Sequence, residues 1–294
     1  MISILSLVYN HEKYLDNFFN GVLSQKLSDD IELIIGIDAS TDRSKEICLS
    51  YQGKYPGIIK IISHKNRVGM FENFKSVFNK CQGKYIAICE GDDYWIDEHK
   101  LMKQIAVLDN DENAILSFTD IKIYDEEEGT FHDNWASISK TLYTIDDVVR
   151  NNPISTCSVL FRNGFIKKIS EQFGNLSMVD WPLYVHLLKH GHALYLQDIT
   201  AVYRRSFQSS YSRNSILDQL NKKVKVYEYF LQAPEFEANS KLVKRCYYLN
   251  LYAMAIRLEK TDRYRMVTLK KIAANFLEYK DIRLLCKSIF RMMF

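Results

Sequence analysis

Short apolar runs alternate with amphipathic segments through the first hundred residues of the chain. The unbroken runs, rich in isoleucine, cover 2–8, 31–37, 58–63 and 85–89. The segments between them carry apolar residues at helical spacing, over 11–26, 42–52 and 70–81. Uninterrupted apolar strands that alternate with helices indicate βαβ units around a parallel sheet that is buried on both faces.

The pattern changes after residue 114. It predicts a long strand, a hairpin turn and three further strands, over 114–124, 125–129, 154–162, 193–197 and 199–205, with a helix over 179–189. Beyond about 215 only helical patterns remain, over 216–232, 240–259 and 264–292, with a break near Pro234. We therefore predict an α/β domain over 1–215, with halves 1–110 and 111–215, followed by an all-helical extension over 216–294.

Composition and charge narrow the classes of protein. The chain has 294 residues, 47% of them hydrophobic, which is enough for a core of ordinary size. Its net charge of +3 is too small to indicate a nucleic-acid partner. The six cysteines show no zinc-like spacing, and no apolar run is long enough to span a bilayer. These features predict a cytoplasmic protein with reduced thiols.

Polar residues gather where the predicted strands end. Asn10 follows the first strand, Asp38 the second and Glu90-Gly91-Asp92-Asp93 the fourth, while Asp180 opens a later helix. Right-handed crossovers place these ends at one edge of a sheet, where ligands bind. Crowded carboxylates repel one another, and Mg²⁺ or Mn²⁺ shared with a diphosphate removes that penalty. The alternative is an acidic turn that caps the helix near 97–109.

Four segments in fixed order carry a family resemblance. They read Ser3-Ile4-Leu5-Ser6-Leu7-Val8-Tyr9-Asn10, Ile37-Asp38-Ala39-Ser40-Thr41-Asp42, Asn66-Arg67-Val68-Gly69 and Gly83-Lys84-Tyr85-Ile86-Ala87-Ile88-Cys89-Glu90-Gly91-Asp92-Asp93-Tyr94-Trp95. Together they resemble the nucleotide-binding half of family 2 glycosyltransferases, which have the Rossmann-like GT-A fold. A looser match reaches about 205 through Val179-Asp180-Trp181 and Val202-Tyr203-Arg204.

The resemblance implies inverting transfer from a nucleoside-diphosphate sugar, commonly linked to UDP, to an acceptor hydroxyl. By that analogy Asp38 bonds the base, Glu90 lies near the ribose and Asp92 binds the metal. Asp180 matches the family's general base, which accepts the acceptor's proton. The donor site implied in this way comprises Val8, Tyr9, Asn10, Glu12, Asp38, Asn66, Gly69, Glu90, Gly91 and Asp92.

Departures from the family pattern leave some roles open. Ile37-Asp38 replaces the usual pair of aspartates, and no histidine follows Tyr203-Arg204-Arg205, so the third metal ligand is not identified. Arg204 or Arg205 could instead neutralise the diphosphate. Processive synthases carry a Gln-x-x-Arg-Trp motif that this chain lacks, which favours addition of one sugar per encounter, as in bacterial surface-glycan synthesis.

The basic, apolar C-terminal segment has two interpretations. From Asp262 to Phe294 it carries eight Lys or Arg against three Asp or Glu. It could dock on the body or form a homodimer. It could also be an interfacial helix that brings the enzyme to an anionic membrane and a lipid-linked glycan acceptor.

Two other functions compete with transfer of a sugar. A sugar nucleotidyltransferase would show a glycine-rich phosphate loop after the first strand, and Asn10-His11-Glu12-Lys13 contains no glycine. A catalytically degenerate relative that binds only a nucleotide or a partner remains an alternative because of the altered Ile37-Asp38 pair. Intact Asp38, Asp92 and Asp180 favour the enzyme.

Overall fold

The computed structural model describes residues 1–134, 138–166, 173, 176, 178–205, 215–258 and 268–270. The chain divides into two compact units, Met1–Gln208 and Ser209–Phe294. The boundary that the sequence predicts near 215, between the α/β domain and the helical extension, stays a prediction.

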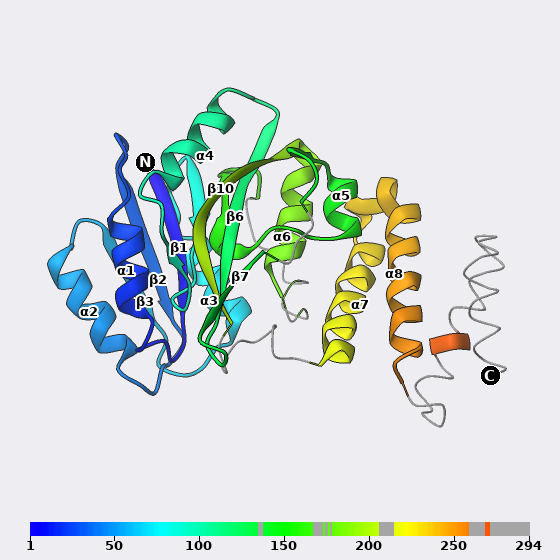
Figure 1. The fold of residues 1–294 in the computed structure, drawn as a ribbon, viewed down its shortest axis with the longest axis horizontal. Helices are drawn as coiled ribbons and strands as arrows, with labels where there is room; N and C mark the ends of the chain where they lie inside the picture. The colour runs from blue at the N-terminus through cyan, green and yellow to red at the C-terminus, as the bar shows by residue number, and fades with distance from the viewer. Residues whose placement is uncertain are drawn as a thin grey trace. The chain divides into compact units, whose positions relative to one another are not determined.

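One mixed sheet organises the first unit (Figure 1). Its main path runs β3-β2-β1-β4-β9-β6-β10-β5, with β7 paired to β6 and β8 paired to β10. The strands are β1 (Ile2–Val8), β2 (Ile31–Ile37), β3 (Ile59–Ser63), β4 (Tyr85–Ile88), β5 (Tyr94–Trp95), β6 (Ala114–Asp125), β7 (Thr130–Asp133), β8 (Leu142–Tyr143), β9 (Val159–Arg162) and β10 (His192–Arg205). The helices are α1 (Leu15–Leu23), α2 (Ser44–Lys54), α3 (Met70–Phe78), α4 (Lys100–Asp109), α5 (Ile145–Arg150) and α6 (Asp180–Leu187).

The strand directions gather the loops of interest at one edge of the sheet. β1 pairs in parallel with both β2 and β4, and β2 pairs in parallel with β3. β9 runs antiparallel to both β4 and β6, so β6 has the direction of β4, and β10 is parallel to β6. The carboxyl ends of β1, β2, β3, β4, β6 and β10 therefore meet at this edge, as the predicted α/β architecture requires.

Apolar residues from the sheet and its helices form the core. Phe18, Phe19 and Val22 of α1 are completely buried against it, because helical spacing puts them on one face. Burying each such side chain stabilises the fold by about 1.5–3 kcal/mol. Trp95 of β5 belongs to the same core, so the strand that follows the acidic loop is anchored to α1.

Some predicted elements differ from those observed. The first helix begins at Leu15 and not at 11, because the backbone N–H groups of His11 and Glu12 donate to the side chains of Ser44 and Asp42. The predicted strand 154–162 starts at Val159, since Ser155 to Ser158 form a hydroxyl-supported 3₁₀ turn. The two strands predicted over 193–205 are one strand, β10, in which shifts of register absorb the irregularity.

The second unit contains α7 (Ile216–Gln232), with the predicted bounds, and a 3₁₀ turn at Pro234–Asn239, where a break was predicted. Helix α8 (Ser240–Ala255) follows and ends before the predicted residue 259. Buried aromatic residues join them, with the rings of Phe230 and Phe236 in edge contact at 4.9 Å. Of the predicted helix 264–292, only 268–270 are described, so the membrane and dimer interpretations fall outside the described residues.

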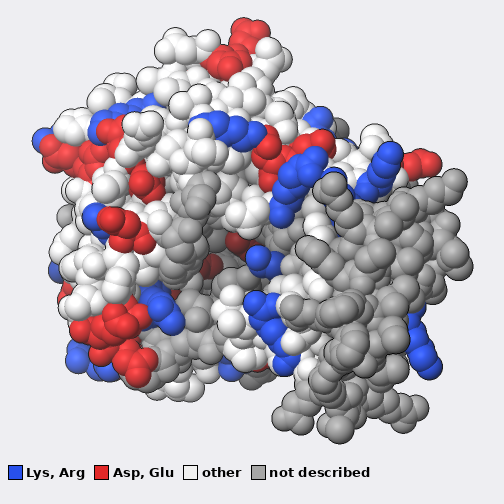
Figure 2. All heavy atoms as spheres, turned by 45° about the vertical axis from the view of Figure 1, so that its right-hand side comes forward, with Lys and Arg blue, Asp and Glu red and all other residues white. Residues whose placement is uncertain are grey.

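Charged groups are interspersed over the face drawn in Figure 2. Among the described residues there, Lys and Arg do not form the continuous basic surface that follows a nucleic-acid backbone. No helix within the described residues is long and apolar enough to span a bilayer.

The contact between α1 and β5 yields a stability prediction. A Cβ at Gly21 would collide with the backbone of Trp95, whose nitrogen would lie at 2.8 Å. We expect Gly21→Ala to lower the free energy of unfolding by about 1–3 kcal/mol, because a backbone cannot rotate aside. Gly53→Ala in α2 is the matched control, since a Cβ there meets nothing within 4 Å. This substitution should leave the free energy of unfolding unchanged or raise it by up to about 1 kcal/mol. Urea unfolding of both variants tests this, and equal midpoints would contradict it.

Candidate functional site

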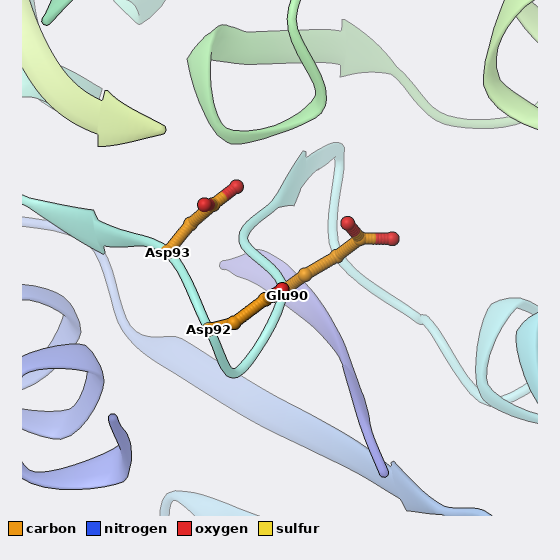
Figure 3. Close-up of side chains that lie close together, drawn as sticks. All are labelled: Glu90, Asp92 and Asp93. Atoms are coloured by element: carbon orange, nitrogen blue, oxygen red, sulfur yellow. The ribbon is translucent and has the colours of Figure 1, made fainter. Parts of the chain in front are cut away.

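The loop between β4 and β5 brings three carboxylates together (Figure 3). One ligand oxygen each from Glu90, Asp92 and Asp93 lies within 4.8 Å of the others. The loop continues the pairing of β4 with β1, because Gly91 N donates to Leu7 O at 3.0 Å. The strand pairing thus forces the acidic residues into this arrangement despite their mutual repulsion.

Crowding and burial perturb these acids. Burial, with the carboxylates of Asp92 and Asp180 nearby, raises the pKa of Glu90 to about 8. Burial, with the carboxylates of Asp92 and Glu90 nearby, raises the pKa of Asp93 well above its usual value. One oxygen of Asp93, Oδ2, is buried without a hydrogen-bond partner among the described residues. Such a site favours a positive charge, so its residues fit a divalent cation.

Gly91 is required by packing inside the protein. A Cβ at Gly91 would lie 2.8 Å from Cγ2 of Val8 and 2.9 Å from Nδ1 of His11. The space beside Gly91 is filled by Val8 of β1 and by His11 of the loop that follows β1. His11, which sequence reasoning missed, also approaches the acidic loop, with Nε2 3.9 Å from Oδ2 of Asp92.

The loops after β1 and β2 are tied together. Asn10 accepts from Thr41 N at 2.8 Å, and Glu12 accepts from Arg43 N at 2.9 Å. Asn10 and Ala39 both adopt positive φ, at 58° and 49°. A left-handed alanine costs energy and persists only where neighbouring contacts enforce it. Asn10 and Glu12 therefore shape this edge through backbone contacts.

Asp38 organises the loop before α3. Its two carboxylate oxygens accept from Val68 N at 2.6 Å and from Gly69 N at 3.0 Å. Gly69 has φ +86°, which glycine adopts without strain, and Asn66 is exposed in the same loop. Arg67, another residue that sequence reasoning missed, stacks on Tyr9 with its Cζ 4.0 Å from the ring centroid. A flat cationic and aromatic surface therefore lies beside Asp38.

The two arginines at the end of β10 have different surroundings. Arg204 is buried, and its Nε donates to the backbone oxygen of Asp92 at 2.9 Å. Arg205 is half exposed and pairs with Asp125 at 3.2 Å. The acidic residues between β6 and β7 also take part in contacts, since Glu126 accepts from the hydroxyl of Tyr14.

Asp180 begins α6, as the helical pattern predicts. Its charge helps to raise the pKa of Glu90, so the two carboxylates share one electrostatic environment. Burial raises the pKa of Asp180, partly opposed by backbone N–H groups at the helix start. Trp181 fixes the helix by donating Nε1 to Val148 O at 2.9 Å. A carboxylate with a raised pKa is a better proton acceptor.

The contact between Asp38 and the loop before α3 yields a second prediction. In Asp38→Asn one acceptor oxygen becomes a donor that faces a backbone N–H group, which costs about 1–3 kcal/mol locally. We expect faster amide exchange at Val68 and Gly69, measured by hydrogen–deuterium exchange. The control is Asp42→Asn, because Asp42 accepts from Glu12 N and Ser44 N and so supports a different loop. Unchanged exchange at Val68 and Gly69 in Asp38→Asn would refute this role.

Solved structures show which fold this site belongs to. The structure of TarS residues 1–349 from S. aureus in complex with UDP-GlcNAc aligns with a TM-score of 0.65 at 15% identity, covering 99% of this chain and 89% of that one. The mannosyltransferase PcManGT from Pyrobaculum calidifontis, in complex with GDP-Man and Mn²⁺, aligns with a TM-score of 0.62 at 12% identity, covering 100% and 87%. At these identities the likeness shows the fold, which is GT-A as expected.

Sequence comparisons define the family. An uncharacterized protein of Mycobacterium bovis is 33% identical over 205 residues, which are 69% of this chain and 58% of that protein. This chain thus spans 58% of that relative's length. The minor teichoic acid biosynthesis protein GgaA of Bacillus subtilis is 41% identical over 68 residues, 22% of this chain and 15% of GgaA. The family described as Glycosyl transferase family 2 matches residues 3–171, and the chain belongs to that family.

Proposed function

We propose that this protein is an inverting glycosyltransferase that moves one sugar from a nucleoside-diphosphate sugar to an acceptor hydroxyl. The observation that carries the proposal is the cluster of Glu90, Asp92 and Asp93 after β4, at the sheet edge where Asp38 follows β2. The charge of Asp180 also acts on Glu90. Of several carboxylates in one site, one can help to bind the charged donor while another accepts the proton of the acceptor hydroxyl.

The nucleotide is proposed to bind across the ends of β1, β2 and β3. Tyr9 offers a ring for the base, and the Asp38 carboxylate keeps lone pairs beyond the two N–H groups it already accepts. The structures bound to UDP-GlcNAc and GDP-Man support a nucleotide-sugar donor. We take UDP as the nucleotide, in line with the family resemblance.

Asp92, with Glu90 beside it, is proposed to hold Mg²⁺ or Mn²⁺. Asp93 is less suited, because its Oδ1 already accepts from Arg204 N at 2.8 Å. When bound, the cation would neutralise charge on the diphosphate. The raised pKa of Glu90 describes the site without a cation, and a positive charge would lower it.

Asp180 is proposed to act as the general base. As the acceptor oxygen attacks the anomeric carbon, the Asp180 carboxylate takes the hydroxyl proton. The bond between the anomeric carbon and the diphosphate oxygen breaks, and its electron pair leaves with the nucleoside diphosphate. One displacement of this kind inverts the anomeric centre, and burial of Asp180 strengthens it as a base.

A relative supports the proposed class of acceptor. The match to a teichoic acid biosynthesis protein supports a role in assembly of a bacterial surface polysaccharide or oligosaccharide. We propose transfer of one sugar per encounter to a glycan or lipid-linked glycan. The diphosphate role first assigned to Arg204 or Arg205 is kept for Arg205, which is more exposed.

Titration of UDP by calorimetry with and without Mn²⁺ tests the donor site. We expect binding of native protein to require Mn²⁺, and Asp92→Ala to weaken it at least about tenfold, because a charged ligand oxygen is lost. Asp29→Ala is the matched control, since Asp29 precedes β2 at the opposite edge of the sheet. Undiminished Mn²⁺-dependent binding by Asp92→Ala would refute the metal role, and failure of native protein to bind UDP or other nucleotides would favour the degenerate relative.

Turnover separates the base from the donor site. Screening UDP-sugars and GDP-mannose for release of the nucleoside diphosphate identifies a donor. With that donor we expect Asp180→Asn to lower kcat by about 10²–10⁴-fold while leaving nucleotide affinity close to native, because an amide cannot accept the proton. Native turnover by Asp180→Asn would show that the proton goes elsewhere.

A further inference from the structure

Arg204 is enclosed by aromatic rings. Its Cζ lies 4.8 Å from the ring centroid of Tyr14, 5.3 Å from that of Tyr94 and 5.4 Å from that of Tyr124. The residue as a whole is only 8% exposed. Among the described residues no carboxylate lies within ion-pair distance of its guanidinium, so the aromatic faces are its main counterpart.

The same residue contacts the acidic loop twice. Its backbone N donates to Oδ1 of Asp93 at 2.8 Å, and its Nε donates to the backbone oxygen of Asp92 at 2.9 Å. These two bonds hold consecutive residues of the loop from the end of β10. Because the Asp92 carbonyl belongs to the backbone that carries the Asp92 side chain, fixing it limits where that carboxylate can point.

The three tyrosines come from separate elements of the fold. Tyr14 precedes α1, Tyr94 lies in β5 and Tyr124 lies near the end of β6. Tyr14 is itself held by the β6–β7 hairpin, because its hydroxyl donates to the carboxylate of Glu126 at 2.9 Å. The position of the guanidinium therefore depends on both halves of the sheet.

The chemical nature of this enclosure explains why it suits the site. A buried arginine is ordinarily paired with a carboxylate. Such a partner here would add another negative charge beside Glu90, Asp92 and Asp93, whose mutual repulsion is already large. An aromatic face attracts the cation through its quadrupole and brings no net charge. The enclosure therefore holds Arg204 in place without a further carboxylate beside the acidic loop.

We propose that Arg204 is a positioning residue: held by Tyr14, Tyr94 and Tyr124, it fixes the Asp92–Asp93 backbone in the conformation that presents the carboxylates to a cation. The inference rests on the proposed function for the purpose of that conformation. The contacts themselves do not depend on a ligand, so the role can be tested separately.

The first test uses hydrogen–deuterium exchange of the full-length chain without metal or nucleotide. We expect amides of 91–95 to exchange at least about tenfold faster in Arg204→Lys, because an ammonium lacks the planar donor geometry that reaches the Asp92 carbonyl while lying on the rings. Arg204→Met, which also lacks the charge, should exchange at least as fast. Native exchange at these amides in both variants would overturn the proposal.

Arg162→Lys is the matched control. Arg162 also lies over a tyrosine, 5.6 Å from the centroid of Tyr85, and donates to Ala114 O at 2.9 Å, but at the opposite edge of the sheet. Its substitution should leave exchange of 91–95 unchanged even if global stability falls. Equal acceleration of these amides in Arg162→Lys and Arg204→Lys would show a general loss of stability and overturn a local role.

Variants at Tyr14 separate the ring from the hydroxyl. Tyr14→Phe keeps the ring and loses the bond to Glu126, so exchange of 91–95 should change by less than in Tyr14→Leu, which loses both. The reverse order, or no change in Tyr14→Leu, would contradict an aromatic enclosure.

Mn²⁺ titration followed by electron paramagnetic resonance should show a dissociation constant at least about tenfold higher in Arg204→Lys than in native protein. Absence of Mn²⁺ binding by native protein would count against the proposed function alone, because the exchange measurement decides the role of Arg204 by itself.

Discussion

Repulsion among carboxylates at the end of β4 is the constraint around which this site is built. Glu90, Asp92 and Asp93 occupy four consecutive positions with one glycine, and Asp180 adds its charge from the start of α6. An unsupported loop would spread these groups into water. The pairing of β4 with β1, the packing of Gly91 against Val8 and the bonds from Arg204 hold the loop in place. The energy of strand pairing and core burial thereby opposes the repulsion.

The contacts of the three loop acids divide their roles. Asp93 is buried and has one oxygen committed to the backbone of Arg204, so it ties the loop to β10. Asp92 and Glu90 remain partly accessible, and the pKa of Glu90 is raised by its neighbours. In the proposed function, a cation relieves the repulsion at the accessible pair. Arg204 holds this loop through a backbone carbonyl, and Asp38 holds the loop before α3 through backbone N–H groups.

Sequence periodicity predicted the elements that depend on local pattern. The bounds of β2 and α7 were predicted to the residue, because a continuous apolar run and a capped amphipathic segment each mark where the element begins and ends. The start of α1 and the continuity of β10 were predicted wrongly, since bonds from distant side chains and pairing with β6 decided them. Helix α5 was not predicted, although Thr144 and Asp147 form a capping box that was readable in the sequence.

The spacing of apolar and polar residues by itself determined the parallel strands of the first half and the acids that follow β2 and β4, and the family was indicated by the resemblance of four short motifs. All of these features lie within short segments, so no distant contact is needed to infer them. Only the tertiary structure decided what surrounds the acids: Arg67 on Tyr9, His11 near Asp92, and Arg204 among three tyrosines. Tyr14 and Arg204 are 190 positions apart in the chain, and nothing in the periodicity of either segment specifies their contact. It exists because β10 returns beside β6 and places its last residues at the edge where β1 ends.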